Sequence, residues 1–389
     1  MKLDGLDFLD LSSHLSENEI MVQQSTRKFV DKEIIPIIDE YFENGTFPDS
    51  LTHKIANMGF FGINLPKEDG GGGMNNIIYG LVCQEIERGD SAIRSFISVQ
   101  SSLVMYPIHA FGSDVQRGKW LPLLAKGDAI GSFGLTEPDS GSDPGSMKTL
   151  AKKVDGGFLI NGNKMWITNG SNADISVVWA KTEDEVVRGF LIEKGMKGFS
   201  TPEMKHKWSL RASVTSELIL QDVFVPEENL LPGVEGLKGP LSCLSQARYG
   251  IGWGAIGCAM AVYEASLKYA KERIQFQKPI GSFQLVQEKL VWMLTEITKG
   301  QLLAYHVGKN KDAGTVTPQQ ISMLKRNNTW VARECAKLAR ELHGANGISG
   351  EYPIMRHLMN MESVYTYEGT FDMHTLILGQ DITGISAFR

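Results

Sequence analysis

The residues best suited to chemistry in this 389-residue chain lie near its C-terminal end, in the stretch 365–370 with the sequence Y-T-Y-E-G-T. In one interpretation Glu368 is a solvated carboxylate in a turn, Gly369 supplies a positive φ angle and Thr370 caps a helix over residues 371–378. In the other, Glu368 is a general base. Aromatic neighbours then desolvate it and raise its pKa, and Gly369 lets backbone amides approach a substrate carbonyl.

A second group of polar residues lies in the run 133–143, F-G-L-T-E-P-D-S-G-S-D, where helical patterns give way to β patterns. Its composition is that of a loop, but the hydroxyls of Thr136 and Ser142 and the amides exposed by glycine also suit a cradle for a flavin ring or its pyrophosphate. Trp166 and Thr168, in the run W-I-T, are either a wall and a hydrogen-bond donor for that ring or part of a strand with a core tryptophan.

Two later turns also have two interpretations. Arg273 ends a long helical pattern, where an arginine often interacts only with the helix dipole but can equally reach a cofactor phosphate. The run 344–347, G-A-N-G, is typical of a helix C-cap or of a surface that a nucleotide approaches closely.

Helical patterns fill almost all of the first 125 residues and must position several of these groups. Ser16 followed by Glu19 predicts a capping box that opens a helix running to about residue 35, where Pro36 interrupts it. The glycine run 70–73 lacks the Gly-Lys-Ser/Thr of a phosphate-binding loop, so we interpret it as a flexible connection. Further helices are expected at about 50–58, 75–88 and 93–110.

Short apolar runs with β-branched residues follow between residues 132 and 225, and turn signals at 155–157 and 161–163 separate them. Because no helical pattern intervenes, these strands predict a compact antiparallel β-barrel or sandwich. The runs are 158–160, 165–168, 175–179, 190–192 and 218–225.

From about residue 239 the helical pattern returns, with long helices expected over 240–273, 284–312 and 318–342. With the terminal helix they predict a bundle. The fold class is therefore α+β and multi-domain, with an N-terminal helical domain (1–130), a middle antiparallel β-barrel (131–235) and a C-terminal four-helix bundle (236–389).

The composition argues against several classes of function. The net charge of −6 and a pI near 5.8 argue against nucleic-acid binding. No apolar run reaches the roughly 18 residues that a membrane span needs, and residues 1–15 resemble neither a secretory signal nor a transit peptide. Cysteines without C-x-x-C spacing predict no metal site, no disulfides and a cytoplasmic location. They are Cys83, Cys243, Cys258 and Cys335.

Five motifs, taken in order along the chain, resemble those of one enzyme family. They are F-G-L-T-E-P-D-S-G-S-D, W-I-T-N, R-I-Q-F, G-A-N-G-I and Y-E-G-T. At this spacing they resemble the acyl-CoA dehydrogenase family, whose fold has the same helical, β, helical order. The resemblance implies non-covalently bound FAD, a homotetramer, and transfer of electrons to electron-transferring flavoprotein.

Within that family the chain is most similar to the glutaryl-CoA dehydrogenases, in the stretches 94–95 with 98–105, 247–251, 324–328 and 366–370. The resemblance implies that Glu368 takes the α-proton of an acyl-CoA thioester while flavin N5 takes a hydride from the β-carbon. The thioester oxygen is expected to be held by the backbone amide of Glu368 and by a ribityl hydroxyl of FAD. Some relatives carry the base beside the position of Arg248, but Ala247 stands there.

The prediction of the substrate rests on Arg94. An unpaired guanidinium is costly to bury, so a fatty acyl pocket has no use for it, whereas a dicarboxylic substrate can pair with Arg94 and Ser95. Glu87 resembles the acid that hydrogen-bonds this arginine in decarboxylating members. The alternative is that Glu87 and Arg94 form a structural ion pair or lie on a solvated face. The resemblance implies oxidation of glutaryl-CoA to crotonyl-CoA and CO2.

The resemblance also implies binding residues. Ser142, Arg248, Tyr367 and Gly369 match positions that contact the acyl-CoA. Gln284 and the turn 341–345 match places where the adenine half of FAD crosses to a neighbouring subunit, although Glu341 and Ala345 depart from the amide and the glycine found in many relatives. The matched FAD positions are Phe133, Leu135, Thr136, Gly141, Ser142, Trp166, Ile167, Thr168, Arg273, Phe276, Gln284, Glu341, Gly344, Ala345 and Thr370.

Three alternatives stay open: a glutaryl-CoA dehydrogenase that does not decarboxylate, a short-chain acyl-CoA dehydrogenase or oxidase, and a non-catalytic scaffold that binds CoA or flavin. Arg94 argues against the second. The intact Glu368, with Tyr367 and Thr370, argues against the third.

Overall fold

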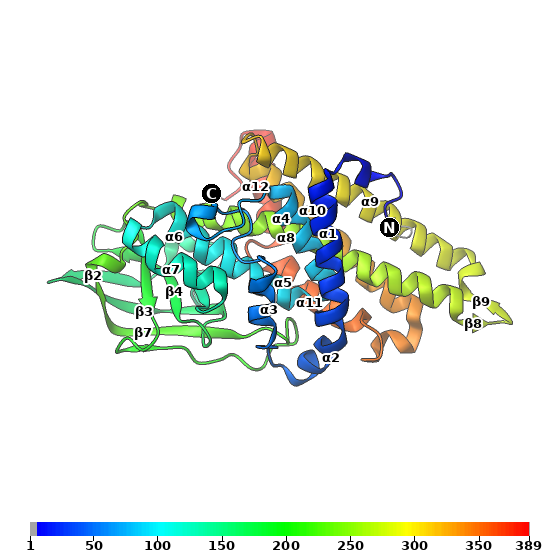
Figure 1. Ribbon diagram of the computed structural model, residues 1–389, viewed down its shortest axis with the longest axis horizontal. Helices are drawn as coiled ribbons and strands as arrows, with labels where there is room; N and C mark the ends of the chain where they lie inside the picture. The colour runs from blue at the N-terminus through cyan, green and yellow to red at the C-terminus, as the bar shows by residue number, and fades with distance from the viewer. Residues whose placement is uncertain (1–5, 389) are drawn as a thin grey trace.

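The computed structural model describes residues 6–388, so the first five residues and Arg389, which the predicted outer domains include, lie outside it. Helices make up the first and last parts of the chain, and a sheet lies between them in sequence and at one end of the molecule (Figure 1). The N-terminal helices are α1 (Glu17–Phe29), α2 (Ile35–Asn44), α3 (Leu51–Asn57), α4 (Asn76–Gly89), α5 (Ser91–Ser98), α6 (Tyr106–Phe111) and α7 (Asp114–Lys126).

The start of α1 confirms the predicted capping box. The Ser16 hydroxyl accepts from the Glu19 amide, and the Glu19 carboxylate accepts from the Ser16 amide at 2.7 Å. A π-helical turn, Val30–Ile34, then joins α1 to α2, and Pro36 lies in the first turn of α2. A second π-helical segment, Val99–Met105, joins α5 to α6 within the span where one continuous helix was expected. Such segments are not visible in a 3.6-residue pattern because they change the helix by a single extra residue.

Within the described residues the middle of the chain forms a seven-stranded sheet in the order β1-β4-β2-β3-β7-β6, with β5 beside β4. Four pairs are antiparallel, but β1 and β2 both pair in parallel with β4. The expectation of a wholly antiparallel arrangement is therefore wrong for these two pairs, because β4 enters the sheet between β1 and β2 and runs in their direction. The strands are β1 (Gly131–Gly134), β2 (Leu150–Val154), β3 (Gly157–Thr168), β4 (Ile175–Thr182), β5 (Val187–Glu193), β6 (Phe199–Ser200) and β7 (Thr215–Pro226).

The long strand β3 corrects another prediction. Residues 161–163, predicted as a turn, lie inside β3, whose register against β7 shifts between Ile160 and Gly162. A bulge accommodates turn-forming residues there because pairing with β7 continues on both sides. A second shift, between Lys164 and Ile167, contains Trp166, whose φ of 63° is unusual for a bulky residue.

The C-terminal helices follow the prediction closely and add one helix that was not expected. A small hairpin of β8 (Ile274–Gln275) and β9 (Lys278–Pro279) joins the first two at the end of the molecule opposite the sheet (Figure 1). The helix that was not expected, α11, leads directly to the Glu368 turn. The helices are α8 (Lys238–Glu272), α9 (Gln284–Asp312), α10 (Pro318–His343), α11 (Ile354–Thr366) and α12 (Phe371–Thr383).

The longest helix, α8, connects the two helical parts, because it packs against α4 on one side and α10 on the other. One large apolar cluster joins the N-terminal helices, β1 and α8, a second lies among α8, α9, α10 and α11, and a third lies within the sheet. Between residues 6 and 388, no helix combines the length and the apolar character that crossing a membrane requires.

Candidate active site

The turn between α11 and α12 has the geometry that both sequence interpretations required. Glu368 and Gly369 have consecutive positive φ angles of 52° and 95°. The Thr370 hydroxyl accepts from the Met373 amide at 3.1 Å, which confirms the predicted cap of α12. The turn is therefore a tight reversal that presents the Glu368 side chain from between two helices.

The Glu368 side chain is half-buried. Its Oε2 is buried and has no hydrogen-bond partner among residues 6–388. Burial raises the pKa of Glu368 to about 7, although the positive charges of Arg94, Lys325 and Arg248 act in the opposite direction. Arg248 also donates from Nε to the Glu368 carbonyl at 2.7 Å. A half-buried carboxylate with a raised pKa can accept a proton from a bound molecule.

Arg94 and Glu87 are brought together beside this carboxylate. Arg94 Nε donates to Glu87 Oε2 at 2.6 Å, and the two side chains are 1% and 0% exposed. The other end of the guanidinium contacts the hydroxyl of Tyr367, the residue before Glu368. Burial raises the pKa of Glu87 against the opposing charge of Arg94. The solvated-face alternative is therefore wrong, and the ion pair exists. Ser95, next to Arg94 on α5, is also buried.

A glycine of α8 makes room for this pair. A Cβ on Gly254 would lie 2.0 Å from Glu87 Oε2 and 3.1 Å from Arg94 Nε. Real Cβ atoms do not come within 3.0 Å of such an atom, so a side chain at this position would require the Glu87 carboxylate to move. The Glu87–Arg94 pair thus depends on α8 as well as on α4 and α5.

Two residues near Glu368 were missed at the sequence level. Lys325 of α10 is fully buried, and its Nζ donates to the carbonyls of Tyr367 (2.6 Å) and Gly369. His374 of α12 is buried against Gly369, and neither ring nitrogen has a partner among the described residues. Lys325 had one signal, since it lies in the stretch 324–328 that resembles the glutaryl-CoA dehydrogenases. His374 had none beyond its place one turn after Thr370.

The predicted flavin segments lie against each other. The Met165 amide donates to the Thr136 carbonyl at 2.9 Å, which holds the loop after β1 beside the bulge of β3. Phe133, Leu135 and Ile167 are buried, whereas Trp166 is 58% exposed, so the core-tryptophan alternative is wrong. The bulge turns the indole outward, and it leaves an apolar plane next to the half-buried Thr136 and Thr168.

Comparison with known proteins decides the family. The acyl-CoA dehydrogenase N-terminal, middle and C-terminal domains match residues 16–128, 132–223 and 235–383. An acyl-CoA dehydrogenase of Bacillus subtilis strain 168 is 36% identical, and the match covers 95% of this chain and 99% of that one. The chain belongs to the acyl-CoA dehydrogenase family. A glutaryl-CoA dehydrogenase of Desulfococcus multivorans is 34% identical over 96% of this chain and 98% of its own.

Solved structures of acyl-CoA dehydrogenases agree. The crystal structure of glutaryl-CoA dehydrogenase from Mycobacterium smegmatis is 50% identical, covers 99% of both chains and superposes with a TM-score of 0.97. A glutaryl-CoA dehydrogenase of the same organism in complex with FADH2 is 47% identical over 99% of both chains, also with a TM-score of 0.97. The protein is thus an FAD-dependent oxidoreductase, and the predicted fold order, enzyme class and cofactor are confirmed.

The residues of this acyl-CoA dehydrogenase fit a flavin at the β3 bulge. A flat apolar ring would cover the exposed Trp166 plane, and the hydroxyls of Thr136 and Thr168 suit polar atoms at its edge. Gly141 and Ser142 are exposed on the adjoining loop, and a Cβ at Gly141 would meet no atom within 4 Å, which leaves open space there.

Most of the other predicted FAD residues lie away from the β3 bulge. Arg273, Phe276 and Gln284 are exposed around the β8–β9 hairpin, at the end of the molecule opposite the sheet (Figure 1), and Phe276 is 85% exposed. Glu341 pairs with Lys289 at 2.7 Å, and Gly344 and Ala345 are exposed after α10. One chain therefore does not bring all predicted FAD residues into one site.

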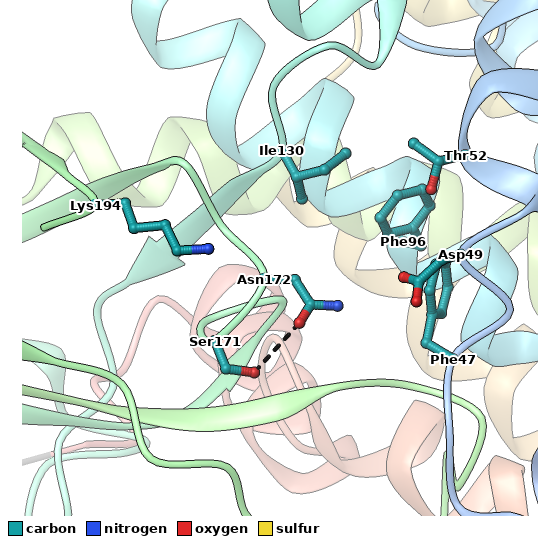
Figure 2. Close-up of a pocket in the computed structure, with 8 residues that line it drawn as sticks. All are labelled: Phe47, Asp49, Thr52, Phe96, Ile130, Ser171, Asn172 and Lys194. Atoms are coloured by element: carbon teal, nitrogen blue, oxygen red, sulfur yellow. Dashed lines mark hydrogen bonds between the residues drawn. The ribbon is translucent and has the colours of Figure 1, made fainter.

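A surface cavity of about 310 Å³ lies apart from the Glu368 cluster. Figure 2 shows it between α5, the segment before α3 and the loop after β3, where Ser171 contacts Asn172. None of the predicted site residues lines it. Its lining residues are Phe47, Asp49, Thr52, Phe96, Ile130, Ser171, Asn172 and Lys194.

Proposed function

We propose that this acyl-CoA dehydrogenase oxidises glutaryl-CoA and releases crotonyl-CoA and CO2. The observation that carries the proposal is the buried Glu87–Arg94 pair beside a carboxylate, Glu368, with a free oxygen. The likeness to the glutaryl-CoA dehydrogenases of Mycobacterium smegmatis and Desulfococcus multivorans supports the same substrate.

In the proposed reaction Glu368 removes the α-proton of the thioester. Its raised pKa suits a base that works near neutral pH. The positive charges of Arg94, Arg248 and Lys325 stabilise the negative charge that develops during proton removal. FAD would accept the β-hydride. Thr136, Trp166 and Thr168 would hold the FAD.

Arg94 would bind the distal carboxylate of the substrate, with the Ser95 hydroxyl beside it. The arginine would share its charge between that carboxylate and Glu87, to which its Nε donates. After oxidation the C–C bond to the carboxylate breaks, CO2 leaves, and its bonding electrons pass into a dienolate. The protonated form of Glu368 then returns a proton and gives crotonyl-CoA.

We also propose the domain boundaries 1–130, 131–235 and 236–389, a homotetramer, and electron-transferring flavoprotein as the acceptor of electrons. The position of Arg273, Phe276 and Gln284 supports an assembly, because their contacts with the flavin of the β3 bulge would have to come from a second copy (Figure 1).

Product analysis by mass spectrometry tests the function directly. Purified holoenzyme is mixed with glutaryl-CoA and a ferrocenium-type acceptor, and crotonyl-CoA with CO2 is expected. Accumulation of glutaconyl-CoA would retain the dehydrogenase and remove the decarboxylation step. Turnover of butyryl-CoA without turnover of glutaryl-CoA would instead identify a short-chain enzyme.

A further inference from the structure

Two cations hold the backbone on both sides of the proposed base. Lys325 Nζ donates to the carbonyl of Tyr367 at 2.6 Å and to that of Gly369. The carbonyl between them, that of Glu368, accepts from Arg248 Nε at 2.7 Å. Three successive carbonyls are therefore bound by a buried ammonium from α10 and a guanidinium from α8.

This turn needs such support. Glu368 has a φ of 52°, a left-handed conformation that is unfavourable for a non-glycine residue, and Gly369 follows at 95°. A residue held in a sparsely populated conformation is destabilising and persists only where its surroundings hold it. Because Oε2 of Glu368 has no partner among residues 6–388, the direction of the carboxylate is set mainly by the turn itself.

We propose that Lys325 is a positioning residue for Glu368: its two hydrogen bonds fix the turn that carries the carboxylate, and its charge favours the ionised form. The inference rests on the proposed function, since it takes Glu368 to be the base. Lys325 does not need to touch the substrate, because it acts through the carbonyls on either side of Glu368.

Lys325 is one of several charged groups that surround Glu368. The charged and titratable groups that face Glu368 are Arg94 from α5, Arg248 from α8, Lys325 from α10, the neighbouring Tyr367, and His374 from α12. Burial, with Lys325 and Arg248, lowers the pKa of His374 to about 2, so this histidine stays neutral near neutral pH. Burial lowers the pKa of Lys325, and the charge of Glu368 opposes that change. Lys325 and Glu368 thus each favour the charged form of the other.

The test compares Lys325→Met, Lys325→Arg and Lys311→Met with the wild-type holoenzyme. Lys311 is the matched control, because it is a half-buried lysine of α9 whose ammonium bonds to the Gln246 side chain instead of to the turn. The measurements are kcat and KM against pH, exchange of the α-proton of a CoA ester, and deuterium exchange of the 365–374 peptide. Deuterium exchange reports on the turn without any turnover.

For Lys325→Met we expect kcat to fall by about 100-fold, the size of effect seen when a catalytic group is misplaced by about 1 Å. KM should change far less. The acid limb of the pH profile should move to higher pH, because a positive charge that lowers the pKa of Glu368 is gone. Amides of the 365–374 peptide should exchange faster. Lys325→Arg should restore the acid limb, and Lys311→Met should leave the limb and the peptide unchanged.

Wild-type kcat with an unshifted acid limb in folded, yellow Lys325→Met would overturn the inference. If this variant does not fold, Lys325→Gln, which keeps two N–H donors without the charge, tests the same shift. A wild-type enzyme that does not convert glutaryl-CoA refutes the proposed function only. In that case α-proton exchange with butyryl-CoA and deuterium exchange of the turn still decide on Lys325.

Discussion

Arg94 donates to Glu87 at 2.6 Å inside the protein, and neither side chain is more than 1% exposed. The arginine is therefore neutralised before any substrate arrives, and its burial alone does not require an anionic ligand. Its contact with the Tyr367 hydroxyl links the pair to the residue beside the proposed base. A substrate carboxylate would have to share the guanidinium with Glu87, and this arrangement can be tested by changing either partner.

Replacing Arg94 should lower activity toward a dicarboxylic substrate more than activity toward a monocarboxylic one. Arg94→Ala should lower kcat/KM for glutaryl-CoA by at least about 100-fold more than for butyryl-CoA, because a charge-assisted pair with the distal carboxylate is lost. Leaving Glu87 buried without its cation costs about 3–5 kcal/mol. The double variant with Glu87→Gln removes that penalty and is the control. Equal losses on both substrates in the double variant would rule out a role of Arg94 in binding the carboxylate.

Replacing Glu368 should prevent removal of the α-proton without preventing binding of FAD or of CoA esters. Glu368→Gln should keep its yellow colour and bind CoA esters, but α-proton exchange should fall by about 10²–10⁴-fold, the usual contribution of a general base. Absorbance spectra and exchange into deuterated water measure these two properties. Retained turnover in this variant would show that another group is the base.

The pH dependence follows from the raised pKa of Glu368. Proton removal needs the carboxylate, so kcat/KM should fall as the pH decreases through a value near 7, well above the usual range of a glutamate. Burial is the main cause of the shift, and the three cations limit it. A rate profile from pH 5 to 9 at constant ionic strength measures the limb. An acid limb near 4.5 would mean that the carboxylate is solvated in the working enzyme.

The hairpin at the far end should affect flavin retention. Phe276→Ala and Gln284→Ala should each weaken FAD binding, seen as loss of yellow colour on gel filtration, although the β8–β9 hairpin and the start of α9 lie at the end of the molecule opposite the sheet (Figure 1). The control is Val115→Ala, a strongly exposed apolar residue of α7. Unchanged FAD content in both hairpin variants would argue against a flavin shared between subunits.

A methyl group at position 254 should disrupt the Glu87–Arg94 pair. Gly254→Ala places a Cβ 2.0 Å from Glu87 Oε2, so the pair has to move, and both Tm and glutaryl-CoA turnover should fall. Gly118→Ala is the control, because that exposed helical glycine has open space around it and should gain up to about 1 kcal/mol of stability. Gly254→Ala with normal turnover would mean that the pair is not needed.

Much of this architecture could be predicted from local sequence. The Ser16 capping box and the ends of the long helices α8, α9 and α10 follow from caps and 3.6-residue periodicity, and all were located within two residues. The five motifs also gave the family, because their order along the chain is specific.

What could not be predicted depends on contacts between distant segments. The bulges of β3 arise from pairing with β7, and the short, glycine-rich β1 forms only because β4 lies beside it. Lys325 is one lysine in a basic helix until the fold places its ammonium under the Glu368 turn. The stretch 324–328 was matched as a motif, but its sequence alone does not show that Lys325 contacts the turn that carries the base.

The contact between Gly254 and Glu87 also bears on how this site can change during evolution. Positions 87, 94 and 254 lie on three helices, yet the acid and the arginine can keep their present geometry only while the third position has no side chain. They form one inherited unit, so a descendant that acquires a larger residue at 254 must lose the pair or rebuild it. A single codon change in α8, which carries neither Glu87 nor Arg94, could therefore remove this ion pair during evolution.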